Sequence, residues 1–302
     1  MNIAIIGAGA MGCLFAARLA LGGAQVSLVE VDEASIAAIA RHGLRLHVGE
    51  RQHPVIRLPI ARAEHTQGPF DLLMVFTKGL HTRSAIASVR HLLGPDTWVL
   101  TLQNGLGNAE CIAETVAAER VLIGMTDVPA DLSAPGVVHA IDSGKVRLWR
   151  YRGDSDAAPR AVSQLLRRAG FDSAADPAVQ SAIWEKVAFN AALNALCTLL
   201  GQPVGVIGAS ADGRWLAERV VEESQRIAAA EGITFDSARV LARMQRVYGE
   251  QAGHRPSMLQ DRQAGRPSEI ESINGALLRH ARRHHLAAPV LETLYRLVRL
   301  GE

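Results

Sequence analysis

The chain has 302 residues, 48% of them apolar, and its 32 basic and 30 acidic side chains leave a net charge of +2. This length and composition can bury a large core and favour two domains over one. Because the charges nearly balance and form no long run of one sign, we expect neither nucleic acid nor an anionic membrane as a partner.

The three cysteines, Cys13, Cys111 and Cys197, lie far apart and form no CxxC pair. This spacing argues against a disulfide framework and a zinc site, so we expect reduced thiols, no metal and a cytoplasmic location. The first residues are apolar but lack a basic region, and no apolar run approaches the ~20 residues that a membrane helix needs. We therefore expect neither export nor membrane insertion.

The chain opens with the pattern of a strand, a glycine-rich turn and a helix. Residues 3 to 6 form an apolar run that suits a strand buried on both faces. The turn that follows consists of Gly7, Ala8, Gly9, Ala10, Met11 and Gly12. In this G-x-G-x-x-G spacing the first glycine makes the turn, the second admits a pyrophosphate and the third lets helix and strand pack closely. We therefore predict that the turn binds a dinucleotide, with its phosphates at the helix amino terminus.

Glu30 ends the next strand, residues 26 to 30, about 20 residues after the glycine turn, where the dinucleotide fingerprint places an acid. A carboxylate there can accept hydrogen bonds from the hydroxyl groups of the adenine ribose. Val31 follows at the position where an arginine commonly holds the 2′-phosphate of NADPH. The pair favours NADH, unless Glu30 turns toward solvent and another arginine reaches the phosphate. The candidates for that arginine are Arg41, Arg45 and Arg51.

Two further apolar strands are expected to end at the sheet edge where open α/β sheets bind ligands. Residues 71 to 76 lead to Lys78, and residues 97 to 102 lead to Asn104. Asn104 precedes a glycine, so it is either a turn residue or a ligand contact. The other elements expected in this half are a helix near 34 to 40, a hairpin of 44 to 48 and 55 to 58, strands at 121 to 125 and between 136 and 149 with a turn at 143 and 144, and a helix at 157 to 168.

From about residue 178 onward the periodicity is helical almost without interruption. We therefore predict a dinucleotide-binding domain over residues 1–176 and an all-helical substrate domain over residues 177–302. The helices are expected at 179 to 200, 211 to 231, 236 to 249, 269 to 285 and 289 to 300.

A polar stripe follows the first of these helices. Lys186, Asn190 and Asn194 recur at a spacing of four, which aligns them on one face of a mostly apolar helix. Asparagine is a poor helix former, so two of them in a helix interior suggest amides that bind something outside the helix. The alternative is an ordinary solvated face.

A second candidate lies near the start of the fourth helix. Ser268 and Glu271 have the S-x-x-E spacing of a capping box, which would occupy Glu271 with the helix amino terminus. Glu269 is then left without a local structural task and is available to a ligand. Alternatively, it only favours the helix dipole.

Taken together, these motifs resemble the ketopantoate reductase (2-dehydropantoate 2-reductase) family. The resemblance extends over residues 3 to 275 and rests on G-x-G-x-x-G at 7 to 12, Thr-Lys at 77 and 78, Gln-Asn-Gly at 103 to 105, Trp-x-Lys-x-x-x-Asn-x-x-x-Asn at 184 to 194, Ser-Met-x-Gln-Asp at 257 to 261 and Glu-Ile-x-x-Ile-Asn-Gly at 269 to 275. It implies an α/β Rossmann-type domain followed by an all-α C-terminal domain like that of 6-phosphogluconate dehydrogenase. It also implies hydride transfer from NAD(P)H to the 2-keto group of ketopantoate, giving pantoate for pantothenate and coenzyme A biosynthesis.

The resemblance assigns roles to the polar residues. Lys186 would be the general acid on the carbonyl oxygen, and Glu269 a catalytic or substrate-positioning carboxylate. The substrate would be bound by Asn190, Asn194, Ser257 and Asn104. The cofactor would lie near Lys78 and Asn104. The family default is NADPH, and the resemblance leaves a homodimer open.

The chain departs from the family pattern at two places. The basic residue expected after the second strand is absent, and His81 stands where members often have a glutamine. The first departure is the reason why Glu30 and Val31 predict use of NADH.

Two other interpretations remain. The first is a reductase or dehydrogenase for another 2-keto or 3-hydroxy acid. The Lys-x-x-x-Asn spacing on the first helix of the second domain of this chain also resembles that of β-hydroxyacid dehydrogenases. Their glycine-rich stretch before the lysine is missing here. A non-catalytic dinucleotide sensor is disfavoured, because a sensor has no use for a proton donor such as Lys186.

Overall fold

In the computed structural model, which describes all 302 residues, the chain forms two compact units. Unit 1 consists of residues 1–103 and 108–179, and unit 2 consists of residues 104–107 and 180–302. Unit 2 therefore includes a short loop from the first half of the sequence. That loop begins with Asn104, so this candidate residue belongs with the helices of unit 2.

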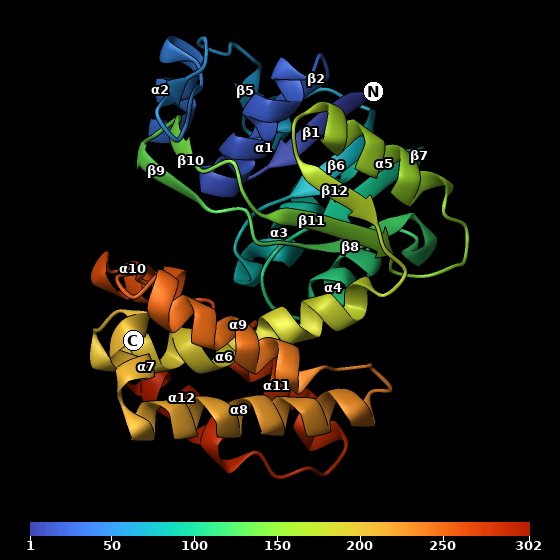
Figure 1. Cartoon of the computed structure of the whole chain (residues 1–302). Helices are drawn as coiled ribbons and strands as arrows, with labels where there is room; N and C mark the ends of the chain where they lie inside the picture. The colour runs from blue at the N-terminus through green and yellow to red at the C-terminus, as the bar shows by residue number, and fades with distance from the viewer. The chain divides into compact units, whose positions relative to one another are not determined.

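Unit 1 is built on an eight-stranded sheet (Figure 1). In spatial order its strands are β12 (Asp172–Ala175), β11 (Lys145–Arg150), β8 (Val121–Thr126), β7 (Leu93–Thr101), β6 (Phe70–Val75), β1 (Asn2–Ile6), β2 (Gln25–Val29) and β5 (Ile60–Ala61). β1 lies between β2 and β6 and is parallel to both, so the strand order reverses beside it. Such a reversal is where doubly wound sheets bind ligands. The sheet confirms the predicted α/β Rossmann-type domain.

A smaller sheet of four strands contains β4 (Arg51–Gln52), β3 (Arg45–Val48), β10 (Val137–Ala140) and β9 (Ala130–Ala134), in that order. The predicted hairpin partner at 55 to 58 is wrong, because β3 pairs with β4 and only Ile56 of that segment forms a bridge, to Leu44. Gly49 has φ +56°, a left-handed conformation that lets the chain turn directly after β3. The turn at 143 and 144 joins no hairpin, since β10 and β11 belong to different sheets.

The helices of unit 1 are α1 (Ala10–Leu21), α2 (Glu33–His42), α3 (Thr82–Ser88), α4 (Asn108–Ala113) and α5 (Ala157–Arg168). Most of α1 is buried, and its Phe15 packs against Phe76 and Phe171 with ring centroids 4.8 Å and 4.3 Å away. Close aromatic packing of this kind holds the helix in place. The glycine turn that precedes α1 is therefore held as well.

Unit 2 is helical, as predicted. Its helices are α6 (Val179–Leu200), α7 (Val204–Ala209), α8 (Ala211–Ala230), α9 (Ser237–Glu250), α10 (Ser257–Gln263), α11 (Asn274–Arg283) and α12 (Pro289–Leu300). The predictions for α6, α8, α9 and α12 are confirmed to within one residue at each end. The sequence does not predict α7 and α10, whose six and seven residues are too few to show a clear helical period.

The predicted capping box before α11 is wrong, and this helix begins at Asn274 rather than at 269. Ser268 does accept a hydrogen bond from a backbone N–H two residues on, but within a turn that precedes the helix. Glu271 instead accepts a hydrogen bond from the Tyr295 hydroxyl at 2.7 Å and pairs with Arg299 at 3.3 Å. Partners on α12, distant in sequence, thus replace the local cap.

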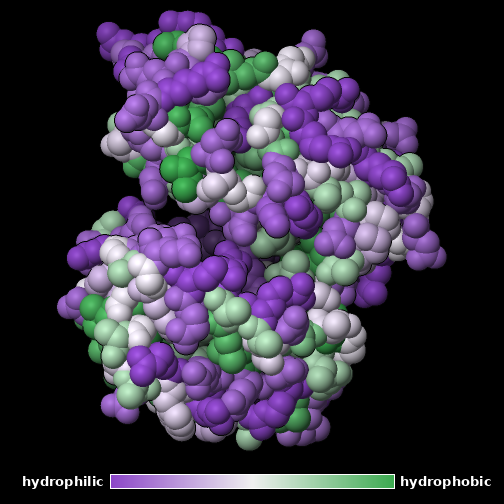
Figure 2. All heavy atoms as spheres, viewed as in Figure 1, coloured by the Kyte–Doolittle hydropathy of each residue, from purple (hydrophilic) through white to green (hydrophobic).

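The surface exposes both hydrophilic and hydrophobic residues. On the face shown in Figure 2, hydrophilic residues dominate and the hydrophobic ones form scattered patches. Exposed apolar side chains such as Val31, Trp215 and Leu300 lie far apart in the sequence, and single exposed apolar residues are ordinary for a protein surface. None of the helices combines the length and the apolar character that a membrane span requires.

All three cysteines are free thiols, and Cys13 and Cys197 are buried. Burial raises the pKa of both buried thiols to about 12. Since the thiolate is the reactive form of cysteine, neither residue is suited to nucleophilic chemistry near neutral pH.

Candidate functional site

The glycine turn of unit 1 has the geometry that its spacing predicts. Gly7 has φ +99°, and a side chain there would press on the backbone of Thr77. At Gly12 an added Cβ would lie 1.8 Å from the carbonyl oxygen of Gly7. At Gly9, by contrast, an added Cβ would meet nothing within 4 Å. Packing therefore requires the first and third glycines, while the second keeps an open space at the start of α1.

Backbone groups border that open space. Gly9 is the N-cap of α1 and provides no side-chain cap, and Ala10 and Met11 are the first helical residues. The first N–H groups of a helix have no partner within the helix. They can bind an anion, with help from the helix dipole. The residues present thus fit a dinucleotide phosphate.

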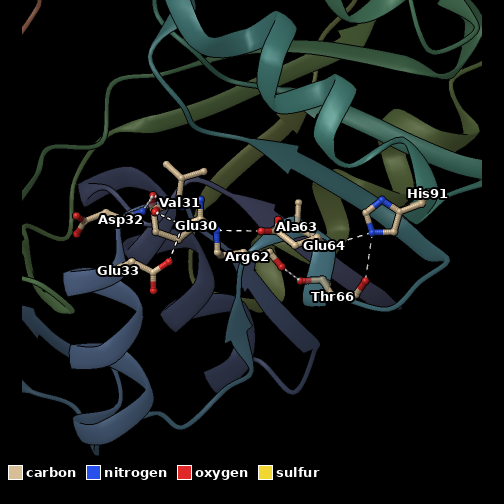
Figure 3. Close-up of polar contacts among 9 residues, drawn as sticks. All are labelled: Glu30, Val31, Asp32, Glu33, Arg62, Ala63, Glu64, Thr66 and His91. Atoms are coloured by element: carbon tan, nitrogen blue, oxygen red, sulfur yellow. Dashed lines mark hydrogen bonds and ion pairs between the residues drawn. The ribbon is translucent and has the colours of Figure 1, made fainter.

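Glu30 is held at the end of β2 by backbone N–H groups. Its Oε1 accepts hydrogen bonds from Val31 N at 2.7 Å and Asp32 N at 3.0 Å (Figure 3), and its Oε2 accepts one from Ala8 N at 2.5 Å. A carboxylate has about four acceptor positions, so one remains for a ligand hydroxyl. Turning Glu30 toward solvent, the alternative considered above, would break all of these bonds, and the structure does not adopt it.

Lys78 lies half-buried just beyond the carboxyl end of β6. The neighbouring strand ends are joined there, because Phe76 N donates to Ile6 O at 2.9 Å and Gln103 Nε2 donates to Thr77 O at 2.7 Å. Lys78 is therefore at the same sheet edge as the glycine turn, as predicted from the strand pattern.

In unit 2, three of the predicted residues come together. Lys186, half-buried on α6, donates from Nζ to Asn104 Oδ1 at 2.8 Å. The Nδ2 of Asn104 donates to Glu269 Oε2 at 3.1 Å. The amide thus connects an ammonium to a carboxylate, and these partners decide which way it points. Asn104 is therefore more than a turn residue, and Glu269 does more than favour a helix dipole.

Gly105 makes this convergence possible. It has φ +89°, and an added Cβ would lie 2.2 Å from the carbonyl oxygen of Ser272. Leu106 donates its N–H to the same oxygen at 2.9 Å, and Ser272 Oγ donates to Glu269 O at 3.2 Å. The loop that carries Asn104 is thereby attached to the turn that carries Glu269.

α6 is fixed immediately before Lys186. The buried carboxylate of Glu185 accepts hydrogen bonds from Arg239 at 2.7 Å and from Asp236 N at 3.2 Å, which attaches α6 to the start of α9. Trp184 packs edge-on against the ring of His280, with centroids 5.1 Å apart. A side chain on such a supported helix is positioned before any ligand arrives.

The two asparagines of the stripe differ from a solvated face. Asn194 is 5% exposed, and Asn190 is half-buried. Neither residue therefore lies on an open solvated face, and binding of a ligand by their amides stays a prediction.

Two other polar residues, Ser257 and Asn274, also belong to unit 2. Ser257 is the exposed first residue of α10, and its contact with the stripe stays a prediction. Asn274, which the sequence analysis did not single out, is fully buried and donates Nδ2 to Ala191 O at 3.0 Å, attaching α6 to α11. Its place beside a glycine in the last family motif was the available signal.

Comparison with known proteins agrees with this geometry. Residues 3–153 match the family model described as ketopantoate reductase PanE/ApbA, and residues 178–302 match the model of its C-terminal part. A 2-dehydropantoate 2-reductase of Halobacterium salinarum is 35% identical, over 100% of this chain and 99% of its own length. A D-mandelate dehydrogenase solved with NADH and anilino(oxo)acetate has a TM-score of 0.95 and 31% identity, over 100% of this chain and 98% of the other. A 2-dehydropantoate 2-reductase from Geobacter metallireducens has a TM-score of 0.94 and 31% identity, over 100% of both chains.

Proposed function

The chain belongs to the ketopantoate reductase family, and we propose on this basis that it reduces ketopantoate to pantoate with a nicotinamide cofactor. As a family member it is an oxidoreductase that acts on a CH-OH group. The observation that carries the proposal is the hydrogen-bonded series of Lys186, Asn104 and Glu269. An ammonium that donates to an amide, which in turn donates to a carboxylate, suits a reaction that turns a ketone into an alcohol.

The reduction places two demands on the protein. As a hydride adds to the ketone carbon, the oxygen gains negative charge and then needs a proton. The nicotinamide, when bound, supplies the hydride. We assign both demands to Lys186 Nζ: its charge stabilises the oxygen, and its N–H bond then breaks to leave an alcohol and a neutral amine. Asn104 fixes one N–H of this group at 2.8 Å, so its direction is set in advance.

The remaining polar residues would bind the substrate. Glu269 accepts from Asn104 at 3.1 Å through one oxygen, and a carboxylate can also accept from a substrate hydroxyl. Asn190 and Asn194 have amide N–H groups suited to the substrate carboxylate. Ser257 would add a hydroxyl. These assignments, a homodimer and a cytoplasmic location stay predictions.

Replacing Gly9 by alanine should weaken cofactor binding and leave the fold intact. The added methyl group would meet no protein atom within 4 Å, so it would occupy the space proposed for the pyrophosphate. We expect the Kd of NADH to rise at least about tenfold in a fluorescence titration, or about 1.4 kcal/mol. Gly249→Ala in α9 is the matched control, because its methyl group also meets nothing within 4 Å. An unchanged Kd for Gly9→Ala would contradict the assignment of the turn.

NADH should serve at least as well as NADPH. Because Glu30 is anchored beside the glycine turn, a 2′-phosphate next to it would meet a like charge. Salt weakens the repulsion, but about 1.4 kcal/mol is enough for a tenfold preference. The similar D-mandelate dehydrogenase was solved with NADH, which supports the proposal. Values of kcat/KM that favour NADPH tenfold or more would overturn it.

The variant Glu30→Ala should shift the ratio of kcat/KM toward NADPH. Removing the carboxylate also leaves the N–H groups of Ala8, Val31 and Asp32 without their acceptor. Binding of both cofactors should therefore weaken, and the ratio between them is the informative quantity.

A second candidate function is the reduction of an aromatic 2-keto acid. It is favoured by the TM-score of 0.95 to a D-mandelate dehydrogenase that holds anilino(oxo)acetate, an oxo acid with an aromatic ring. Assays of nicotinamide absorbance with ketopantoate and with phenylglyoxylate separate the two functions. The proposal predicts the higher kcat/KM for ketopantoate, and a higher value for phenylglyoxylate would assign the second function.

A further inference from the structure

An arginine that the sequence analysis overlooked lies beside the acidic end of β2. β5 runs parallel to β2, with Ile60 opposite Leu28, and Glu30 N donates to Ala61 O at 3.1 Å. Arg62 follows β5 directly, and its guanidinium donates to the carbonyl oxygen of Val31 at 3.2 Å (Figure 3). Val31 occupies the position where related folds often place the cation for a 2′-phosphate. The structure thus supplies that cation from a neighbouring strand.

This guanidinium is already engaged by carboxylates. Its NH1 donates to Glu33 Oε1 at 2.5 Å, and its Nε donates to Glu64 Oε1 at 3.0 Å. Figure 3 shows Arg62 with these two acids, and also Glu30 and Asp32, which precede Glu33 in the chain. Two carboxylates therefore pair with one guanidinium, and the three side chains together carry a net negative charge.

We propose that Glu33, together with Glu64, is a specificity-determining residue that withholds Arg62 from the 2′-phosphate of NADPH. The proposal rests on the proposed use of NADH and names the residues behind it. Glu30 can accept a hydrogen bond from a ribose hydroxyl, whereas a phosphate at that position needs a cation. To bind it, Arg62 would have to leave Glu33 and would bring the phosphate close to further carboxylates.

Arg62 is able to change partners, because the contacts that hold it are exposed. The side chains of Arg62 and Glu33 are 38% and 71% exposed, and exposed ion pairs hold their geometry weakly. Glu33 lies in the first turn of α2, where alanine is also compatible with a helix. Removing its carboxylate should therefore release the arginine without unfolding the helix.

Calorimetric titration with ADP-ribose and with its 2′-phosphorylated form tests the proposal without any catalytic step. The unmodified protein should bind ADP-ribose more tightly. Glu33→Ala should improve the affinity for the phosphorylated form about tenfold, and the variant that also carries Glu64→Ala should improve it further. Affinity for ADP-ribose should stay within about twofold, because neither carboxylate is assigned to the ribose hydroxyls.

Two controls test whether the gain requires Arg62 and whether loss of a carboxylate elsewhere has the same effect. Adding Arg62→Met to Glu33→Ala should abolish the gain, since the phosphate then has no cation. Glu292→Gln removes a carboxylate from an arginine pair in unit 2 and should change neither affinity. An unchanged ratio in Glu33→Ala, while ADP-ribose still binds, would overturn this inference alone.

Discussion

Replacing Lys186 by alanine is expected to lower kcat by a factor on the order of 10²–10⁴, the usual contribution of general acid catalysis. The variant loses both the proton donor and the positive charge proposed to face the ketone oxygen. The glycine turn belongs to unit 1 and is unaffected, so the Kd of the cofactor should change little. Initial rates from nicotinamide absorbance give kcat, and a fluorescence titration gives the Kd.

Two comparisons make this result specific. Lys145→Ala removes an exposed lysine from β11 and should leave kcat unchanged. Lys186→Arg keeps the positive charge but replaces an ammonium by a guanidinium that does not give up its proton, so kcat should remain low. A near-normal kcat in Lys186→Ala would show that another group donates the proton.

The sequence predicts the elements of this site better than its assembly. The spacing of four places Lys186, Asn190 and Asn194 on one face of α6, because a helix repeats its surface at that period. No such period links Lys186 to Asn104, which precedes it by 82 residues. Their contact depends on a loop that belongs to unit 2 although it follows a strand of unit 1. Only the tertiary structure shows that this loop belongs with the helices of unit 2.

Glu269 and Glu271, which precede α11, show that the local rule for a capping box can fail. The S-x-x-E spacing correctly leaves Glu269 for another task, but for the wrong reason. Glu271 does not cap the helix, because it accepts a hydrogen bond from the Tyr295 hydroxyl and pairs with Arg299, both on α12. A capping box is a local preference of about 1 kcal/mol, and tertiary contacts readily override it.

At the proposed cofactor site, the position of Glu30 was predictable from the sequence and that of Arg62 was not. The position of Glu30 follows from the length of one strand-turn-helix unit, so its place beside the glycine turn is predictable. Arg62 follows β5, a two-residue strand with no sequence signal of its own. Its pairing with β2 is needed to recognise that a cation lies beside Val31.

Ketopantoate should be strongly preferred over the analogue that lacks only its terminal hydroxyl. Glu269, the residue proposed to accept a hydrogen bond from a substrate hydroxyl, is half-buried beside Asn104. The analogue lacks that hydroxyl, so the hydrogen bond from substrate to carboxylate would be lost in a site that is partly closed to water. Sites that bind a substrate hydroxyl discriminate against its absence by a factor on the order of 10⁴.

The ratio of kcat/KM for ketopantoate to that for this analogue, measured with NADH on the unmodified protein, tests the central claim most directly. Both compounds carry the same carboxylate and ketone, so the chemistry at the reacting carbon is matched. We expect a preference for ketopantoate of at least about a hundredfold and up to the order of 10⁴. Equal values for the two compounds would contradict a site built for ketopantoate and would indicate a reductase of broader 2-keto acid specificity.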